Sequence, residues 1–298
     1  ILGKFNGRVF IIPGNHDPLV PGSVWDHSPS WSNHANITIF RESAPYDING
    51  CVLYPCVPTA KYNSNDPTAW IDASAKSEIS VGLAHGNVVA SVDEVRDIPI
   101  SAAAVENTGL DYIALGHRHS PLFCGKSDVQ RMAYCGAHEQ CDFGEKDSGC
   151  ALLVEIKDRM AAPSITRIST GILQWKRKEF EIGLDGDIES LDRAITDIHD
   201  PGRTILSLLI TGILHPDILD RLQSLTLEWK NRFMSLAVDS ARIRPAPDDD
   251  SWPQNLPMGI IRDTAADLVE MAKVADRNGE IALVALMELY KMSHEAPI

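Results

Sequence analysis

The sequence predicts an α/β protein, and two observations carry that prediction. Residues 1–182 alternate short β-rich runs with loops, and several runs are almost continuously apolar, which is typical of strands covered on both faces. Residues 203–240 then follow the pattern strand, helix, strand, and two helical segments come after them. With 298 residues, of which 44% are hydrophobic, the chain can bury a sizeable core.

The first region, residues 1–182, is predicted to be one domain built from short strands between turn residues. The predicted strands are residues 8–12, 37–40, 51–55, 79–84, 111–116, 131–136, 151–156, 164–169 and 176–182. Residues 92–107 predict a helical crossover, which Pro99 interrupts because proline lacks a backbone N–H.

The second region, residues 183–245, is predicted to be a small α+β domain, with the boundary near residues 181–187. Its predicted elements are a helix within 187–200, a strand at 203–211, a helix within 215–233 and a strand at 234–240. The second helix has apolar residues at the spacing of one helix face, namely Ile218, Leu222, Leu225 and Trp229.

Residues 246–298 predict a linker and two helices. The segment 244–257 carries four prolines and an acidic triplet, which is typical of a linker. Asn278-Gly279 is a helix stop signal that should separate the two helices, predicted at 262–276 and 280–292.

Charge and cysteine content restrict the function. The 27 basic and 41 acidic residues give a net charge of −14, which argues against binding nucleic acid by long-range attraction. A polyanionic substrate would need a local patch, a metal or a partner. The six cysteines form no C-x-x-C pair, and we expect reduced thiols that mainly pack. No segment resembles a signal peptide or a membrane span, so we expect a soluble, cytoplasmic protein without membrane association.

Potential metal ligands follow three of the predicted strands. Asn15 follows residues 8–12, His85 follows 79–84, and the pair His117 and His119 follows 111–116. Each alone is a common turn or strand-end residue. The carboxyl ends of parallel strands meet at one edge of a sheet, so the three groups should converge. Imidazole and amide oxygen suit manganese, iron or zinc better than calcium.

In this order, "GNHD", "AHG" and "GHRH" resemble three successive motifs of the calcineurin-like metallophosphoesterases. The stretches "ALGHRHSPLF" and "YCGAHEQCDFGEKDSGCALLVEI" are similar to the DNA-repair exonuclease branch, whose nuclease subunit partners an SMC-like ATPase in the SbcCD complex. The shared positions are Tyr134, Gly136, Phe143, Glu145, Gly149, Leu152, Leu153, Glu155 and Ile156. The resemblance covers most of residues 8–245. It implies a two-sheet sandwich flanked by helices, the calcineurin-like phosphoesterase fold, followed by a capping domain.

The resemblance implies two divalent metal ions, with manganese placed ahead of iron or zinc. Asn15, His85 and His117 would bind one ion, and His119 would bind the other. Two such ions can neutralise the attacking and the leaving oxygen of a phosphodiester. The implied partners are DNA and an SMC-like ATPase, and a homodimer is compatible with the resemblance.

Further residues have implied roles around the metals. His16 would stabilise charge on the scissile phosphate or protonate the leaving oxygen, and Asp17 would orient His16 or support the loop. Arg118 lies between two ligands and would contact substrate. The strand residues Lys176, Arg177 and Lys178 could bind a nucleic-acid backbone, although an exposed basic strand explains them equally well.

The family's first two motifs, an Asp-x-His and a Gly-Asp, should precede "GNHD", and the residues before Pro13 are too few to hold them. Asp197-Ile198-His199 and Gly186-Asp187 read as solvated ends of a predicted helix, and Asp26-His27 has the wrong spacing. We therefore expect a phosphoesterase domain that lacks its N-terminal part, binds at most one metal weakly and has little nuclease activity.

The leading functional hypothesis is metal-dependent cleavage of DNA ends. One alternative is a metallophosphoesterase that acts on small-molecule or protein phosphoesters, because the superfamily shares the three motifs. Another is a non-catalytic scaffold that binds an ATPase partner. The apolar segment 280–292 could then serve as a partner-binding helix, although internal packing is the commoner fate of such a helix.

Overall fold

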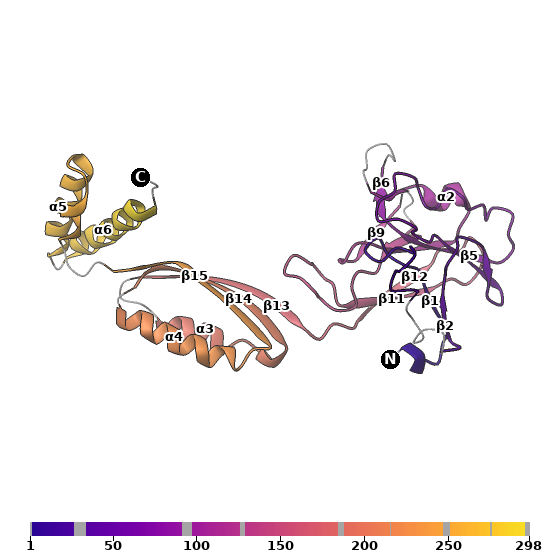
Figure 1. Ribbon diagram of the computed structural model, residues 1–298, viewed down its shortest axis with the longest axis horizontal. Coiled ribbons are helices and arrows are strands. Elements are labelled where there is room, and N and C mark those ends of the chain that lie inside the picture. Colours follow the sequence, from indigo (N-terminus) through magenta and orange to yellow (C-terminus); the bar gives the residue numbers. More distant parts are fainter. Residues whose placement is uncertain are drawn as a thin grey trace. The chain divides into compact units, whose positions relative to one another are not determined.

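A computed structural model describes residues 2–26, 34–90, 97–125, 129–183, 188–214, 216–246, 251–274 and 276–295. The α/β class predicted from the sequence is confirmed, since helices accompany a mixed sheet of several strands. The chain divides into two compact units, Ile1–Ile172 and Leu173–Ile298, which are drawn in Figure 1. No helix among these residues is both long enough and apolar enough to cross a membrane.

The first unit is organised around a six-stranded sheet. Its order is β3 (Tyr46–Asp47), β4 (Cys51–Pro55), β5 (Ile79–His85), β8 (Tyr112–Gly116), β10 (Met132–Tyr134) and β9 (Leu122–Cys124). The four inner strands are parallel, and the two outer strands run antiparallel to their neighbours. The inner strands supply half of the buried residues of a core cluster that includes Tyr54, Ile113 and Tyr134. The strand residues of this cluster share one face of the sheet, and burial of that apolar face is a main force that holds the sheet in place.

Within its described residues, three two-stranded ladders and short helices complete the first unit. The ladders are β1 (Val9–Ile11) with β2 (Ile37–Ile39), β6 (Asn87–Val89) with β7 (Pro99–Ser101), and β11 (Cys150–Glu155) with β12 (Ser164–Ser169). The helices are the 3₁₀ turn η1 (Leu2–Lys4) and α2 (Ala104–Thr108).

The helical crossover predicted over residues 92–107 is confirmed only in part. Residues 91–96 lie outside the described part of the chain, and helix forms only in α2. Pro99 instead begins β7, where the first position of a strand tolerates its missing N–H.

A buried ion pair joins the six-stranded sheet to the turn between β11 and β12. The Asp111 carboxylate is fully buried and lies 2.8 Å from the Arg159 guanidinium. It also accepts hydrogen bonds from the backbone N–H of Ser80 at 2.8 Å and of Met160 at 2.5 Å. Arg159 donates in addition to the carbonyls of Ala73 and Gly109, each at 2.6 Å. Every polar atom of the pair therefore has a partner, as burial of charge requires.

The second unit contains a three-stranded parallel sheet in the order β13 (Gln174–Ile182), β14 (Thr204–Leu214) and β15 (Ser235–Pro245). The helices α3 (Ile188–Thr196) and α4 (Pro216–Lys230) cover one face of it, as Figure 1 shows. Between helices and sheet lies a core that includes Leu206, Leu208 and Trp229. The Trp229 Nε1 donates to Asp192 at 2.8 Å and so links the two helices.

Strand pairing explains where the two units divide. The first domain is predicted to extend to residue 182, but β13 pairs with β14 along its whole length. The division therefore falls near residue 172.

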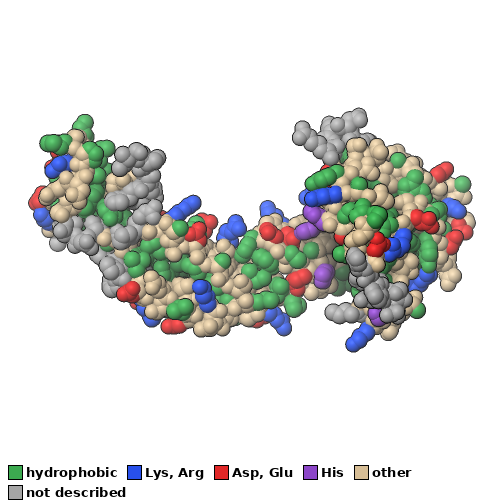
Figure 2. All heavy atoms as spheres, in the orientation of Figure 1, with side chains coloured by type: hydrophobic (Ala, Val, Ile, Leu, Met, Phe, Trp, Pro, Cys, Tyr) green, Lys and Arg blue, Asp and Glu red, His purple; other side chains and the backbone are tan. Residues whose placement is uncertain are grey.

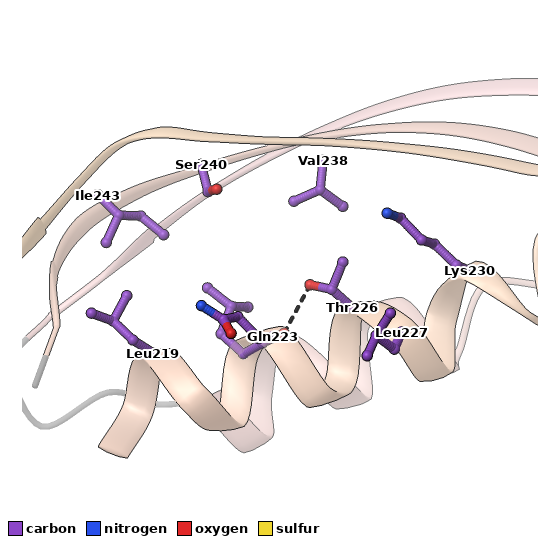
Figure 3. A pocket seen from close by; sticks show the side chains of 9 residues that line it. Leu219, Gln223, Thr226, Leu227, Lys230, Val238, Ser240 and Ile243 are labelled. Carbon is purple, nitrogen blue, oxygen red and sulfur yellow. Dashed lines mark hydrogen bonds between the residues drawn. The ribbon is translucent and has the colours of Figure 1, made fainter. Parts of the chain in front are cut away.

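The second unit also has a groove between α4 and β15, with a volume of about 510 Å³ (Figure 3). Apolar side chains form most of its walls, with Lys230 at one end, as the view of its lining residues shows. The Thr226 hydroxyl donates to the carbonyl of Leu222 at 2.8 Å.

Two helices, α5 (Ile260–Ala272) and α6 (Arg277–Glu295), follow the second sheet. The 3₁₀ turn η4 (Trp252–Asn255) precedes α5, whereas the 3₁₀ turn η3 (Pro201–Arg203) precedes β14. The predicted linker 244–257 is partly structured, because Trp252 is buried and its ring lies 4.9 Å from that of Tyr290. The predicted stop signal at Asn278-Gly279 is wrong. Both residues belong to the first turn of α6, and their N–H groups donate to the carboxylate of Asp276 at 2.9 and 2.8 Å.

Candidate metal centre

The residues expected to bind metal come together at the carboxyl ends of β5 and β8. They line one cavity of about 320 Å³, with Asn15, His16, Asp17, His85, His117, Arg118 and His119 among its walls. Histidine side chains are visible on the surface of the first unit in Figure 2. Candidate ligands that follow three separate strands in the sequence thus meet in one site.

Asn15 and His85 form the buried part of the site. Asn15 is 5% exposed, and its Oδ1 lies 2.9 Å from the Nε2 of His85. An amide oxygen only accepts, so this contact requires the proton of His85 to be on Nε2. Two ligands bound to one ion at about 2.1 Å and at right angles lie about 3 Å apart. The two atoms are therefore already spaced as neighbouring ligands of a single divalent ion.

Glycines next to the ligands make room for the His85 ring. A Cβ on Gly14 would lie 2.9 Å from the ring atom Cε1, and a Cβ on Gly116 would lie 2.8 Å from Nδ1. Any larger residue at either position would displace the imidazole. The glycines of "GNHD" and "GHRH" are thus explained by close packing against a histidine from a third segment.

The two inner histidines are kept neutral. The ring centroids of His85 and His117 lie 5.3 Å apart at an interplanar angle of 85°. Burial, and then the proximity of His117, lowers the pKa of His85 to about 4. Burial likewise lowers the pKa of His117. Neutral imidazole is the form that binds metal, so neither ring carries an extra proton at neutral pH. An ion bound at the Nε2 of His85 would require the proton on that nitrogen to move to Nδ1.

Asn87 is a functional candidate that the sequence analysis missed. Its Nδ2 lies 3.2 Å from the carbonyl oxygen of Asp97 and 3.1 Å from the Nε2 of His117. Since a carbonyl can only accept, the amide must present its NH₂ group to both atoms, and His117 Nε2 must be unprotonated. In the sequence, the position of Asn87 two residues after His85 is the only indication that it belongs to the site.

His119 has a carboxylate partner. Its Nδ1 lies 2.7 Å from Glu145, whose side chain is 7% exposed, whereas that of His119 is 67% exposed. Burial alone would raise the pKa of Glu145, but hydrogen bonds from the Cys141 N–H, His119 and Ser148 outweigh it and lower the pKa. A carboxylate behind a histidine fixes the ring and increases its basicity, which is typical of metal-binding histidines.

Asp17 supports the loop that carries Asn15. Its carboxylate accepts from the Gly14 N–H at 2.8 Å, and its carbonyl accepts from the Trp25 Nε1 at 2.6 Å. The two roles expected for Asp17 are to orient His16 or to support the loop, and these hydrogen bonds favour support of the loop. His16 is exposed at the cavity wall.

Arg118 is exposed beside the ligands, and its guanidinium lies 5.9 Å from the centre of the Tyr134 ring. The Tyr134 hydroxyl donates to the Gly86 carbonyl at 2.6 Å and accepts from the Val88 N–H at 2.8 Å. Burial raises the pKa of Tyr134 to about 12, so the hydroxyl keeps its proton and holds the chain just after His85.

The predicted basic strand does not form one surface. Lys176 and Lys178 pair in register with Leu206 and Leu208, while Arg177 pairs with Ser207. Because side chains alternate along a strand, Arg177 lies on the opposite face from the two lysines. All three belong to the second unit and not to the cavity of the first.

Among the described residues, no three His, Cys, Asp or Glu side chains are grouped as metal ligands. Asn15 and His85 have the spacing that fits one ion. His117 and His119 each have a ring nitrogen in contact with another side chain, Asn87 and Glu145 respectively. Asp187 and His27 lie outside the described residues.

No protein-family model matches this sequence, and a comparison with curated proteins finds no match to it.

Proposed function

We propose that this chain is a metal-dependent phosphoesterase, the nuclease subunit of a DNA-repair exonuclease complex, and that it hydrolyses phosphodiester bonds at DNA ends. One observation carries the proposal. A buried amide oxygen and a neutral imidazole lie 2.9 Å apart at strand ends, with three further histidines lining the same cavity. The order and type of these residues support the calcineurin-like fold as part of the proposal.

Each side chain has a distinct role in this proposal. Asn15, His85 and His117 would hold one ion, and His119, fixed by Glu145, would hold the second ion of a complete two-metal centre. Bound manganese, or iron or zinc in its place, would neutralise charge on the reacting phosphate. His16 offers an exposed imidazole that can stabilise or protonate the leaving oxygen. Of the described residues that line the cavity, Arg118 is the one Lys or Arg, and it adds local positive charge in a chain whose net charge is −14.

The C-terminal helices support a partner-binding role next to the catalytic one. Hydrophobic side chains gather on them in Figure 2, and Met258, Ile260 and Val284 are 91%, 84% and 66% exposed. Apolar exposure of this kind marks a contact surface. An SMC-like ATPase is the proposed partner, with a homodimer as a further assembly and the cytoplasm as the location. If the cavity is inert, docking of this partner remains as a scaffold function.

Metal binding and hydrolysis together test the proposal. Titration calorimetry with Mn²⁺ should show one weak site, because only two ligands are preset, and Asn15→Ala and His85→Ala should each weaken binding by at least about 10-fold. His138→Ala, an exposed histidine outside the cavity wall, is the matched control. Absence of any Mn²⁺ binding would reject the metalloenzyme and leave the scaffold. Faster hydrolysis of nucleotide monoesters or phosphopeptides than of linear DNA would instead favour small-molecule or protein substrates.

A further inference from the structure

Cys135 and Cys150 lie side by side at the base of the loop that carries Glu145. Cys135 directly follows β10, and Cys150 is the first residue of β11. Each thiol donates to the backbone carbonyl of the other residue, Cys135 to Cys150 at 3.3 Å and Cys150 to Cys135 at 3.2 Å. The neighbouring Cys150 thiol also adds to the rise in the pKa of Cys135, after burial as the main cause. Each sulfur atom therefore lies against the backbone of the other cysteine.

Backbone contacts hold the two cysteines in this position independently of their side chains. The Gly149 N–H donates to the Ala137 carbonyl at 2.8 Å, and the N–H groups of Thr170 and Gly171 both donate to the Gly149 carbonyl at 2.9 Å. The chain segments at the start and the end of the loop are therefore fixed to one another before any covalent bond forms.

We propose that Cys135 and Cys150 are a redox modification site, and that oxidation joins them in a disulfide bond across the base of loop 136–149. Hydrogen peroxide is the class of oxidant required. The Cys135 sulfur attacks one peroxide oxygen, the O–O bond breaks, and water leaves a sulfenic acid on Cys135. The Cys150 sulfur then attacks the Cys135 sulfur, the S–O bond breaks, and the thiol proton leaves with the oxygen as a second water. Two thiols are thus oxidised by two electrons and one peroxide is reduced to two waters.

Accessibility sets the order of these steps. Cys135 is partly exposed, whereas Cys150 is 1% exposed, so the oxidant meets Cys135 first. Burial raises the pKa of Cys135, which keeps most of it protonated at neutral pH. The pair should therefore stay reduced under weak oxidant and react faster as the pH rises.

The other cysteines lack this arrangement. Cys141 is exposed, and its thiol contacts the Glu139 carbonyl at 3.4 Å. Cys124 contacts the Met132 carbonyl at 3.8 Å, and Cys56 contacts the Tyr54 carbonyl at 4.0 Å. Within the described residues, which include all six cysteines, only Cys135 and Cys150 exchange thiol–carbonyl contacts.

The bond would act on the loop that holds His119. The Ala137 N–H donates to the His119 carbonyl at 2.8 Å, and Glu145 accepts from the His119 ring at 2.7 Å. Cross-linking the loop base removes conformations of the open loop, so both contacts become harder to break. The disulfide would form whether or not a metal binds, because neither cysteine lines the cavity.

Peroxide treatment of the full chain followed by mass spectrometry tests the proposal. The expected result is loss of two hydrogens, a non-reduced peptide linking Cys135 to Cys150, and slower hydrogen exchange in residues 136–149. Cys135→Ser and Cys150→Ala should abolish the linkage, while Cys141→Ser, a loop thiol outside the pair, should retain it. If Cys150→Ala destabilises the chain, a sulfenic-acid trap should still label Cys135 in the folded fraction.

Three outcomes would overturn the proposal. One is retention of both hydrogens at peroxide concentrations that already oxidise Cys141. Another is a linkage that maps to a different pair of cysteines. The third is a Cys135–Cys150 linkage whose formation leaves the exchange of residues 136–149 unchanged, because the bond would then have no effect on the loop.

Discussion

The His85 Nε2 lies 2.9 Å from the Asn15 Oδ1, although the two residues are 70 positions apart in the chain. This contact makes Asn15 the acceptor that defines the His85 tautomer. Replacing Asn15 by Leu should leave the buried Nε2–H unpaired and lower the free energy of unfolding by about 1–3 kcal/mol. Urea unfolding of the metal-free chain measures this loss. Asn15→Asp keeps an acceptor at the same place and should be much less destabilising.

Acid should destabilise the first unit through His85. Its folded-state pKa of about 4 lies below the ordinary histidine pKa of about 6.5, so the unfolded chain binds more protons between those values. The contribution of His85 to the free energy of unfolding is therefore fully present above about pH 6.5. It falls by at most about 3 kcal/mol as the pH decreases towards 4. Denaturant midpoints measured from pH 4 to 8 test this. His85→Gln should flatten the profile, and an equally steep profile in that variant would assign the effect to other groups.

Asn87 should control which nitrogen of His117 carries the proton. Its NH₂ group donates to the His117 Nε2, which leaves the proton on Nδ1. Asn87→Asp replaces the donor by an acceptor and should move the proton to Nε2. Nitrogen NMR shifts of the histidine rings in the metal-free protein at pH 8 report the tautomer directly. The same variant should bind Mn²⁺ about 10-fold more tightly, since a carboxylate strengthens a histidine ligand. An unchanged tautomer would show that Asn87 does not set the His117 proton.

Breaking the buried ion pair should cost more than breaking an exposed one. Arg159→Met leaves the fully buried Asp111 carboxylate without its cation, and the free energy of unfolding should fall by about 3–5 kcal/mol. Arg203→Met removes an exposed pair with Asp200 at 3.9 Å and should change stability by less than about 1 kcal/mol. Equal effects of the two substitutions, measured by chemical denaturation, would contradict this distinction.

Elements defined by local pattern could be predicted from the sequence. The strand at 164–169 matches β12, and the helix within 215–233 contains α4. The apolar spacing that predicts such elements is also what buries them, as Leu222, Leu225 and Trp229 show. Alternation and helical periodicity are local properties, so short windows of sequence reveal them.

Features that depend on distant residues could not be predicted in this way. Within the helix expected over 92–107, residues 99–101 instead form β7, because they pair with β6 ten or more positions earlier in the chain. Asp276 was overlooked as a helix cap because Asn278-Gly279 resembles a stop signal. In the candidate site, sequence order identified the ligand types, but the partners Asn87 and Glu145 depend on how loops meet in space.

The bonds made by Arg159 also set how the first unit can come apart. Its side chain lies in the turn between β11 and β12, yet it binds Asp111 at the start of β8 and carbonyls at Ala73 and Gly109. The β11–β12 ladder cannot separate from the six-stranded sheet without exposing that carboxylate. The ladder and the sheet should therefore open in a single cooperative event, with the amide hydrogens of both exchanging at a common rate.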